Sequence, residues 1–297
     1  MLQHRCRQNL SALLKTSNAD MPKENTVMKV LRDCSSIVAA IFLLLVSCST
    51  VPITGRTQLD IIPNGTMLAM SLQEYDTFLT SHKLSSNREQ TEMVKRVGER
   101  IQRAVEQYFA QNQLSRELDG YGWEFNLVES DEVNAWCMSG GKVVVYTGIL
   151  PITQDEAGLA TVMGHEIAHA VAKHGNERMS QGLMAEMGGT ALSVALAQKP
   201  QQTRELWMTA FGLGAEVGVL LPYGRLQEEE ADHLGLIFMA MAGYDPNSAL
   251  AFWQRMSEKK DAKSPPAFLS THPSDETRIR KIKALLPEAM RYYTKPR

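Results

Sequence analysis

Apolar residues recur three and four positions apart through much of the chain, the spacing that gives an α-helix one buried face. The clearest example covers residues 92–109, and similar patterns predict helices over 68–82, 227–242 and 273–286. Gly243 directly follows the segment 227–242, and glycine is common just after the C-terminus of a helix. The sequence therefore predicts a mostly helical domain.

Two short segments have the residue types of strands instead. Residues 123–127 alternate between apolar and polar side chains, and residues 142–147 are rich in β-branched side chains. Gly140 and Gly141 directly precede the second segment, as they would in a turn. The predicted fold class is therefore α+β, a helical domain with a small sheet.

The first apolar run extends from Ile37 to Val46. It is too short to cross a bilayer, which takes about 20 residues. Lys29 and Arg32 precede it, so the segment is typical of a secretion signal. A signal begins near its start codon, which makes Met28 the candidate start; residues 1–27 are then either an artefact or an unusual extension.

The end of this run, Leu-Val-Ser-Cys, resembles a bacterial lipobox, in which the cysteine, here Cys48, is lipidated and becomes the first mature residue. Ser49 follows, and by resemblance to sorted lipoproteins this favours the periplasmic side of the outer membrane over the inner membrane. The alternatives are a signal cut elsewhere and a marginal anchor helix. The predicted organisation is an extension with signal peptide over 1–47, a tether over 48–66 and one domain over 67–297.

Composition and charge argue against a nucleic-acid-binding protein and against membrane spans in the domain. Of 297 residues, 44% are hydrophobic and 22% charged, as in soluble globular proteins, and the net charge of −2 gives no field that would attract nucleic acid. The apolar block 182–221 carries Glu186 and Glu216 in its two halves, so neither half predicts a membrane span. We expect this block to pack in the core or as a lid over the active-site cleft.

The strongest chemical signal is His165-Glu166-Ile167-Ala168-His169, an HExxH motif within a helical pattern. Residues four apart share a helix face, so both imidazoles can turn toward one zinc ion. Glu166 lies about 100° round the helix from His165, beside the metal, where it can take a proton from a zinc-bound water. The motif predicts a zinc peptidase.

The motif supplies two ligands, and a third must come from elsewhere. His174 lies five residues beyond the second histidine, so a continuous helix would turn it away from the metal. Glu228 and Asp232 are four apart on a later helix; one can bind zinc while the other accepts a hydrogen bond from a ligand histidine. Glu229 and Glu230 are expected to face solvent.

These motifs together resemble the CAAX-prenyl-protease and HtpX-like zinc metallopeptidases, whose second signature is ExEAD, here residues 228–232. Asn134-Ala135-Trp136 and Thr271-His272-Pro273 add to the resemblance, which covers about residues 50–290. The family includes a periplasmic lipoprotein branch and a mitochondrial inner-membrane quality-control protease. The resemblance implies a zincin-like domain with one zinc, selects Glu228 as the third ligand and leaves Asp232 to support a histidine.

The resemblance also implies a substrate and a way of binding it. Family members cut unfolded or misassembled membrane-associated proteins, which bind in extended form beside an edge strand that flanks the active-site helix. We expect that strand to be residues 142–147, with Val143 and Val145 contacting substrate. The resemblance places His272 near the metal, either as an oxyanion donor or as a resting-state zinc ligand, and Pro273 predicts an extended backbone there.

The resulting hypothesis is a lipid-anchored periplasmic zinc endopeptidase that degrades misfolded or misassembled envelope proteins. The alternative is a chaperone or assembly factor for outer-membrane proteins that uses the same cleft with little proteolysis. Glu166 favours the enzyme, because binding alone does not require a base. The oligomeric state does not follow from the sequence.

Overall fold

The computed structural model describes residues 48–51, 54–216, 220–259, 266–273 and 276–294. The predicted signal peptide and Met28 lie outside these residues. The strands are β1 (Cys48–Thr50), β2 (Thr57–Leu59), β3 (Glu124–Val128), β4 (Ala135–Met138) and β5 (Lys142–Tyr146). The helices are α3 (Asn64–Ser81), α4 (Arg88–Gln111), α5 (Leu150–Thr153), α6 (Glu156–Val171), α7 (His174–Ala195), α8 (Gln201–Ala215), α9 (Leu221–Met241), α10 (Ser248–Ser257), α11 (Ala267–Thr271) and α12 (Glu276–Ala289), with 3-10 turns at Ser115–Leu118 and Thr147–Ile149.

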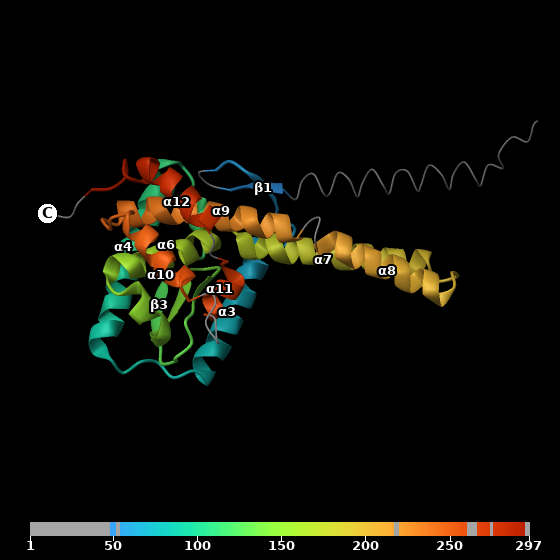
Figure 1. The fold of residues 1–297 in the computed structure, drawn as a ribbon, viewed down its shortest axis with the longest axis horizontal. Coiled ribbons are helices and arrows are strands. Elements are labelled where there is room, and N and C mark those ends of the chain that lie inside the picture. Colours follow the sequence, from blue (N-terminus) through green and yellow to red (C-terminus); the bar gives the residue numbers. More distant parts are fainter. Residues whose placement is uncertain (1–47, 52–53, 217–219, 260–265, 274–275, 295–297) are drawn as a thin grey trace, which may run out of the picture. The chain divides into compact units, whose positions relative to one another are not determined.

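The mostly helical α+β fold predicted from the sequence is confirmed. Helix α6 lies at its centre and packs against α4, α9, α10 and the strand β4, while α12 covers the other side of α9 (Figure 1). Nearly every side chain of α6 is buried. A helix that is apolar all round is typical of a protein core, and the HExxH motif is therefore surrounded by packed side chains.

The sheet corrects one prediction. Its strand order is β3-β5-β4, with β5 parallel to β3 and antiparallel to β4. Strand β5 is therefore central, and Val143 and Val145 are wholly buried in the main core. The prediction that this strand is the substrate edge, with these two valines contacting substrate, is wrong. The edge that packs against α6 is β4.

The physical reason lies in the residues of β5. All five of its side chains are buried. Val143 and Val145 face the main core, whereas Val144 and Tyr146 join a second cluster with Tyr75 of α3 and Val128 of β3. A strand with apolar side chains on both faces is covered on both sides, which is typical of a central strand.

The segment predicted as a tether is partly structured. Strands β1 and β2 pair with each other, and Val51 and Gln58 are buried. The Ile61 amide donates to Ser180 of α7 at 3.1 Å, and Asn176 of α7 donates to the Ile62 carbonyl at 2.7 Å. The chain is therefore docked on the domain well before residue 67.

The apolar block 182–221 also departs from expectation. Helix α7 is buried only in its first two turns, and α8 has no buried residue. The two helices pack against each other (Figure 1). Gly188 of α7 faces Phe211 of α8, and Met187, Leu206 and Trp207 are exposed. Helices α7 and α8 therefore form a hairpin outside the core. No helix among the described residues has both the length and the apolarity to cross a bilayer.

Candidate metal centre

The two histidines of the HExxH motif point to the same place from α6. Asp155 caps the N-terminus of this helix, and its carboxylate accepts from the Gly158 amide at 2.8 Å. His165 and His169 lie one turn apart, and their Nε2 atoms are 3.1 Å from each other. Two imidazole nitrogens at this distance are placed to share a hydrogen or to bind one cation.

Helix α9 crosses α6 in close contact and brings in the third group. A Cβ added to Gly235 would lie 2.9 Å from the His165 amide nitrogen, so only glycine fits at this crossing. Glu228 lies two turns earlier on α9. Its carboxylate oxygens are 3.4 Å from His165 Nε2 and 3.2 Å from His169 Nε2.

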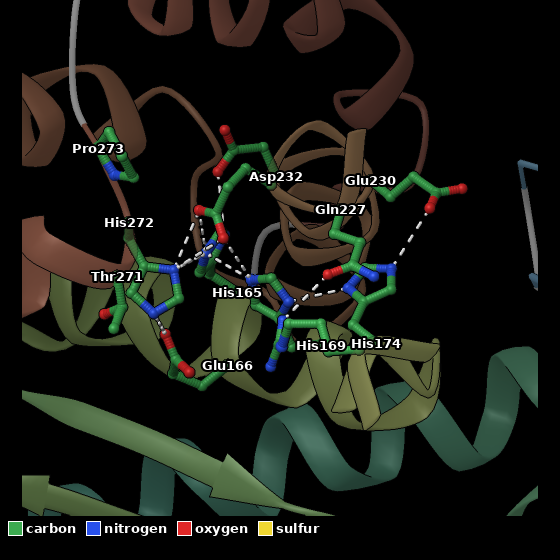
Figure 2. Close-up of polar contacts among 12 residues, drawn as sticks. His165, Glu166, His169, His174, Gln227, Glu230, Asp232, Thr271, His272 and Pro273 are labelled. Carbon is green, nitrogen blue, oxygen red and sulfur yellow. Dashed lines mark hydrogen bonds and ion pairs between the residues drawn. The ribbon is translucent and has the colours of Figure 1, made fainter. Parts of the chain in front are cut away.

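His272 completes the group from the C-terminal side (Figure 2). It follows the short helix α11 and has an extended φ of −125°, as the following proline predicts. Its Nδ1 is 3.0 Å from a Glu228 oxygen and 3.2 Å from His165 Nε2. Four possible metal-ligand atoms therefore lie within 4.8 Å of one another, one each from His165, His169, Glu228 and His272.

The electrostatics of this cluster fit a cation. Burial opposes ionisation of Glu228, but hydrogen bonds from three imidazoles outweigh it and hold the pKa of Glu228 far below its usual range. Burial also disfavours protonated His165, yet Asp232 and Glu228 outweigh it and raise the pKa of His165 to about 9. At His169, by contrast, burial outweighs the contact with Glu228 and holds the pKa well below its ordinary value. An ionised carboxylate and a neutral imidazole are the forms in which these side chains bind a metal. Imidazole nitrogens with a carboxylate form a donor set that suits zinc.

Asp232 contacts His165 from the side opposite Glu228. Its Oδ1 lies 3.0 Å from His165 Nδ1, the ring nitrogen that faces away from the cluster. Arg278 of α12 binds Asp232 through two hydrogen bonds of 2.8 Å, and its Nη1 is 3.1 Å from Glu228. The guanidinium also stacks 3.5 Å from the Trp253 ring centroid. These contacts orient the carboxylates that face His165.

Glu166 lies on the side of α6 that faces His272 (Figure 2). It is 4% exposed, and its Oε1 accepts no hydrogen bond within the described part of the chain. The nearest basic group is His272 Nε2 at 3.3 Å. Burial raises the pKa of Glu166, which makes the carboxylate a stronger base than one in water.

Sequence reasoning missed two residues that support His169. Helix α6 ends at Val171, and Lys173 has a left-handed φ of 59°. The chain therefore turns, and His174 is buried behind His169 instead of being turned away, with the two Nδ1 atoms 2.8 Å apart. Glu230, expected to face solvent, is 7% exposed and lies 3.3 Å from His174 Nε2 (Figure 2).

Arg278 was also missed, and no local signal marks it, because it is one of several basic residues in its helix. His174 had a partial signal in its closeness to the motif. The expectation for Glu229 agrees with the structure, since this residue is half-exposed and paired with Lys281 at the surface.

Comparison with known proteins places this geometry in a family. The family model described as "Peptidase family M48" matches residues 95–286, more than half of the chain. The mitochondrial metalloendopeptidase OMA1 of Schizosaccharomyces pombe is 39% identical over 168 residues, which cover 56% of this chain and 48% of that protein.

Two further relatives are a mitochondrial protein and a bacterial protein. OMA1 of Bos taurus is 30% identical over 247 residues, covering 81% of this chain and 46% of its own length. The "Beta-barrel assembly-enhancing protease" of Escherichia coli is 29% identical over 161 residues, covering 53% of this chain and 33% of its own length. The chain spans about half or less of the length of these relatives. Its match to the family model confirms the resemblance read from the motifs: the chain belongs to peptidase family M48, a family of metallopeptidases.

Proposed function

We propose that this chain is a zinc-dependent endopeptidase that cuts unfolded or misassembled envelope proteins. The observation that carries the proposal is the meeting of His165, His169 and Glu228 at one point, with the buried carboxylate of Glu166 alongside. Two histidines and a glutamate with an adjacent base are the parts that hydrolysis of a peptide bond with metal assistance requires.

The three ligands and Glu166 have separate roles. A zinc ion held by His165, His169 and Glu228 would polarise the substrate carbonyl and acidify water. Glu166 accepts the proton of the attacking water and then delivers it to the nitrogen of the leaving amine. Its burial excludes bulk water and raises its pKa, and both favour this exchange of a proton.

Substrate binds along β4 in this proposal. Within the described sheet, β4 pairs with β5 on one side only, and β4 packs against α6. An extended peptide can pair with the other side of β4 through main-chain hydrogen bonds, which requires an unfolded segment but little sequence specificity. The preference for unfolded protein follows from this mode of binding.

His272 regulates the site in this proposal. Its Nδ1 is within 3.2 Å of His165 Nε2, so the imidazole can act as a fourth ligand at rest and leave when substrate arrives. The second role, donation to the developing oxyanion, uses Nε2, which now lies 3.3 Å from Glu166. We favour the resting-state ligand, because Nδ1 lies among the donor atoms of the cluster.

For the location we propose the periplasmic side of the outer membrane, through a lipid on Cys48. Two observations support this: the lipobox-like sequence, and a bacterial relative named for assembly of β-barrels. Cys48 is exposed. The relatives from mitochondria are also named metalloendopeptidases, so the same reaction is proposed for proteins of a different compartment.

The test is cleavage of reduced, unfolded casein by the purified mature chain, with metal content measured in parallel. We expect one zinc per chain, loss of cleavage on chelation and recovery on adding zinc. His165→Ala removes both metal and cleavage, whereas His82→Ala, a change at an exposed histidine of the surface, alters neither. Binding of casein without cleavage at full zinc occupancy would favour the chaperone alternative.

A further inference from the structure

Arg56 lies between two acidic residues beside the metal centre. This residue belongs to the segment before β2, and its guanidinium Nη1 and Nη2 each donate to a Glu177 oxygen at 2.7 Å. Its Nε donates to Glu230 Oε2 at 2.6 Å, and Thr54 also donates to Glu230. Glu177 is wholly buried and Glu230 nearly so. Arg56 thus connects the N-terminal segment to both α7 and α9.

The contacts continue from Glu230 to a predicted zinc ligand. Glu230 Oε2 is 3.3 Å from His174 Nε2, and His174 Nδ1 is 2.8 Å from His169 Nδ1. His169 Nε2 faces His165 and Glu228 on the opposite side of its ring. Arg56, Glu230, His174 and His169 therefore form one line of contacts that ends at the metal centre (Figure 2, which labels the last three).

The donors and acceptors along this line can be assigned from one end. Glu230 as a carboxylate only accepts, so His174 Nε2 carries the hydrogen in that contact. Neutral His174 then has a bare Nδ1, which must accept, so His169 Nδ1 donates to it. With its hydrogen on Nδ1, His169 presents the lone pair of Nε2 to the cluster. That tautomer is the one that a metal requires at this nitrogen.

We propose that Arg56 is a positioning residue, which holds Glu230 as an oriented acceptor and thereby fixes His169 in its metal-binding tautomer through His174. This inference rests on the proposed function, since it requires a metal at His169. It gives the N-terminal segment, predicted as a mere tether, a part in building the site. A purely structural account, in which Arg56 only neutralises two buried acids, predicts lower stability and no change in metal affinity.

The test compares zinc affinity and apo-protein stability in the full mature chain. Zinc affinity is measured by competition with a chromophoric chelator, and stability by urea unfolding of the metal-free protein. We expect Arg56→Gln and His174→Ala to weaken zinc binding by about 10- to 100-fold, the usual effect of losing a partner of a ligand histidine. Arg56→Lys keeps the charge and should recover part of the affinity.

Arg96→Gln is the matched control. Arg96 also makes a two-point contact with a carboxylate, Glu156, but lies half-exposed and away from the cluster. It should lose no zinc affinity. Nitrogen-15 spectra of the imidazoles in the metal-free wild type should show His174 with its hydrogen on Nε2, and Arg56→Gln should weaken that preference.

The outcomes separate this inference from the proposed function. If the wild type binds no metal, the proposed function fails. If the wild type binds one zinc and Arg56→Gln binds it equally well while unfolding at lower urea, Arg56 is structural and the positioning role is overturned. A His174 ring with its hydrogen on Nδ1 overturns it as well.

Discussion

The contact between α6 and α9 yields the sharpest prediction, because it involves backbone on both sides. In Gly235→Ala the new Cβ would meet the His165 amide nitrogen at 2.9 Å, the Gly164 carbonyl carbon at 3.0 Å and the His165 Cα at 3.1 Å. Carbon atoms pack best at about 3.5–4.0 Å. No side chain can rotate to relieve these contacts, so the two helices must separate by several tenths of an ångström.

The magnitude follows from two opposing effects. Overpacking a well-packed core costs about 1–3 kcal/mol, and a rigid backbone contact belongs at the upper end. Alanine in place of a helical glycine returns about 1 kcal/mol. Gly235→Ala should therefore lower the free energy of unfolding by about 1–2 kcal/mol. It should also weaken zinc binding, because Glu228 moves with α9 relative to the histidines of α6.

The assay is urea unfolding followed by circular dichroism, with zinc affinity measured on the same preparations. Gly224→Ala is the control on the same helix, since nothing lies within 4 Å of a Cβ at that position. It should raise stability by up to about 1 kcal/mol and leave zinc affinity unchanged. If Gly235→Ala is as stable as Gly224→Ala, α6 and α9 do not cross as closely as described here.

Three further predictions concern the active site, the sheet and the anchor. His272→Ala should raise casein cleavage at unchanged zinc content; a loss of about 100-fold would instead identify an oxyanion donor. A hydrogen bond from Lys142 holds the pKa of Glu124 below its ordinary 4.5. The pair therefore stabilises the fold fully above pH 4.5, and this stabilisation is lost as the pH falls through the lowered pKa of Glu124. Glu124→Gln should therefore lower the urea midpoint relative to wild type at pH 7, and this difference should shrink in acid. An equal difference at neutral and acid pH would contradict the pairing. Cys48→Ala should move activity from membrane to soluble fraction and abolish fatty-acid labelling, and persistent membrane association would refute the lipid anchor.

Local patterns predicted the parts of the site that one helix can build. His165 and His169 share a face of α6, and the separation of Glu228 from Asp232 placed both acids against His165. The helical repeat put each pair on one helix face, and the family resemblance then selected Glu228 as the expected ligand. The same repeat failed for His174, because it assumes a continuous helix and Lys173 interrupts the helix with a left-handed residue.

Long-range pairing was beyond the sequence argument. Residues 142–147 were identified as a strand, but the partner on each side was not, and the substrate edge was assigned to the wrong strand. Their run of buried apolar side chains was itself a sign of a central strand. Arg278 lies 50 residues after Glu228 in the chain, and only the packing of α12 on α9 brings it to Asp232.

The hairpin of α7 and α8 shows a different limit. Apolar composition favoured core packing for residues 182–221. Two of their apolar side chains are nevertheless largely exposed, Val194 by 72% and Leu206 by 69%. Composition states how much apolar surface a segment has, and not whether the rest of the domain has room to bury it. None of residues 182–216 belongs to either core cluster.

If Glu166 is the base of a metal-dependent peptidase, removing its charge should stop cleavage without removing the metal. The direct measurement is the rate of casein cleavage by Glu166→Gln relative to wild type, with zinc per chain determined in the same samples. We expect equal zinc content in the two proteins and a cleavage rate that is lower in the variant by about 100-fold or more, the usual contribution of a positioned base. Near-normal cleavage by Glu166→Gln at full zinc occupancy would contradict it.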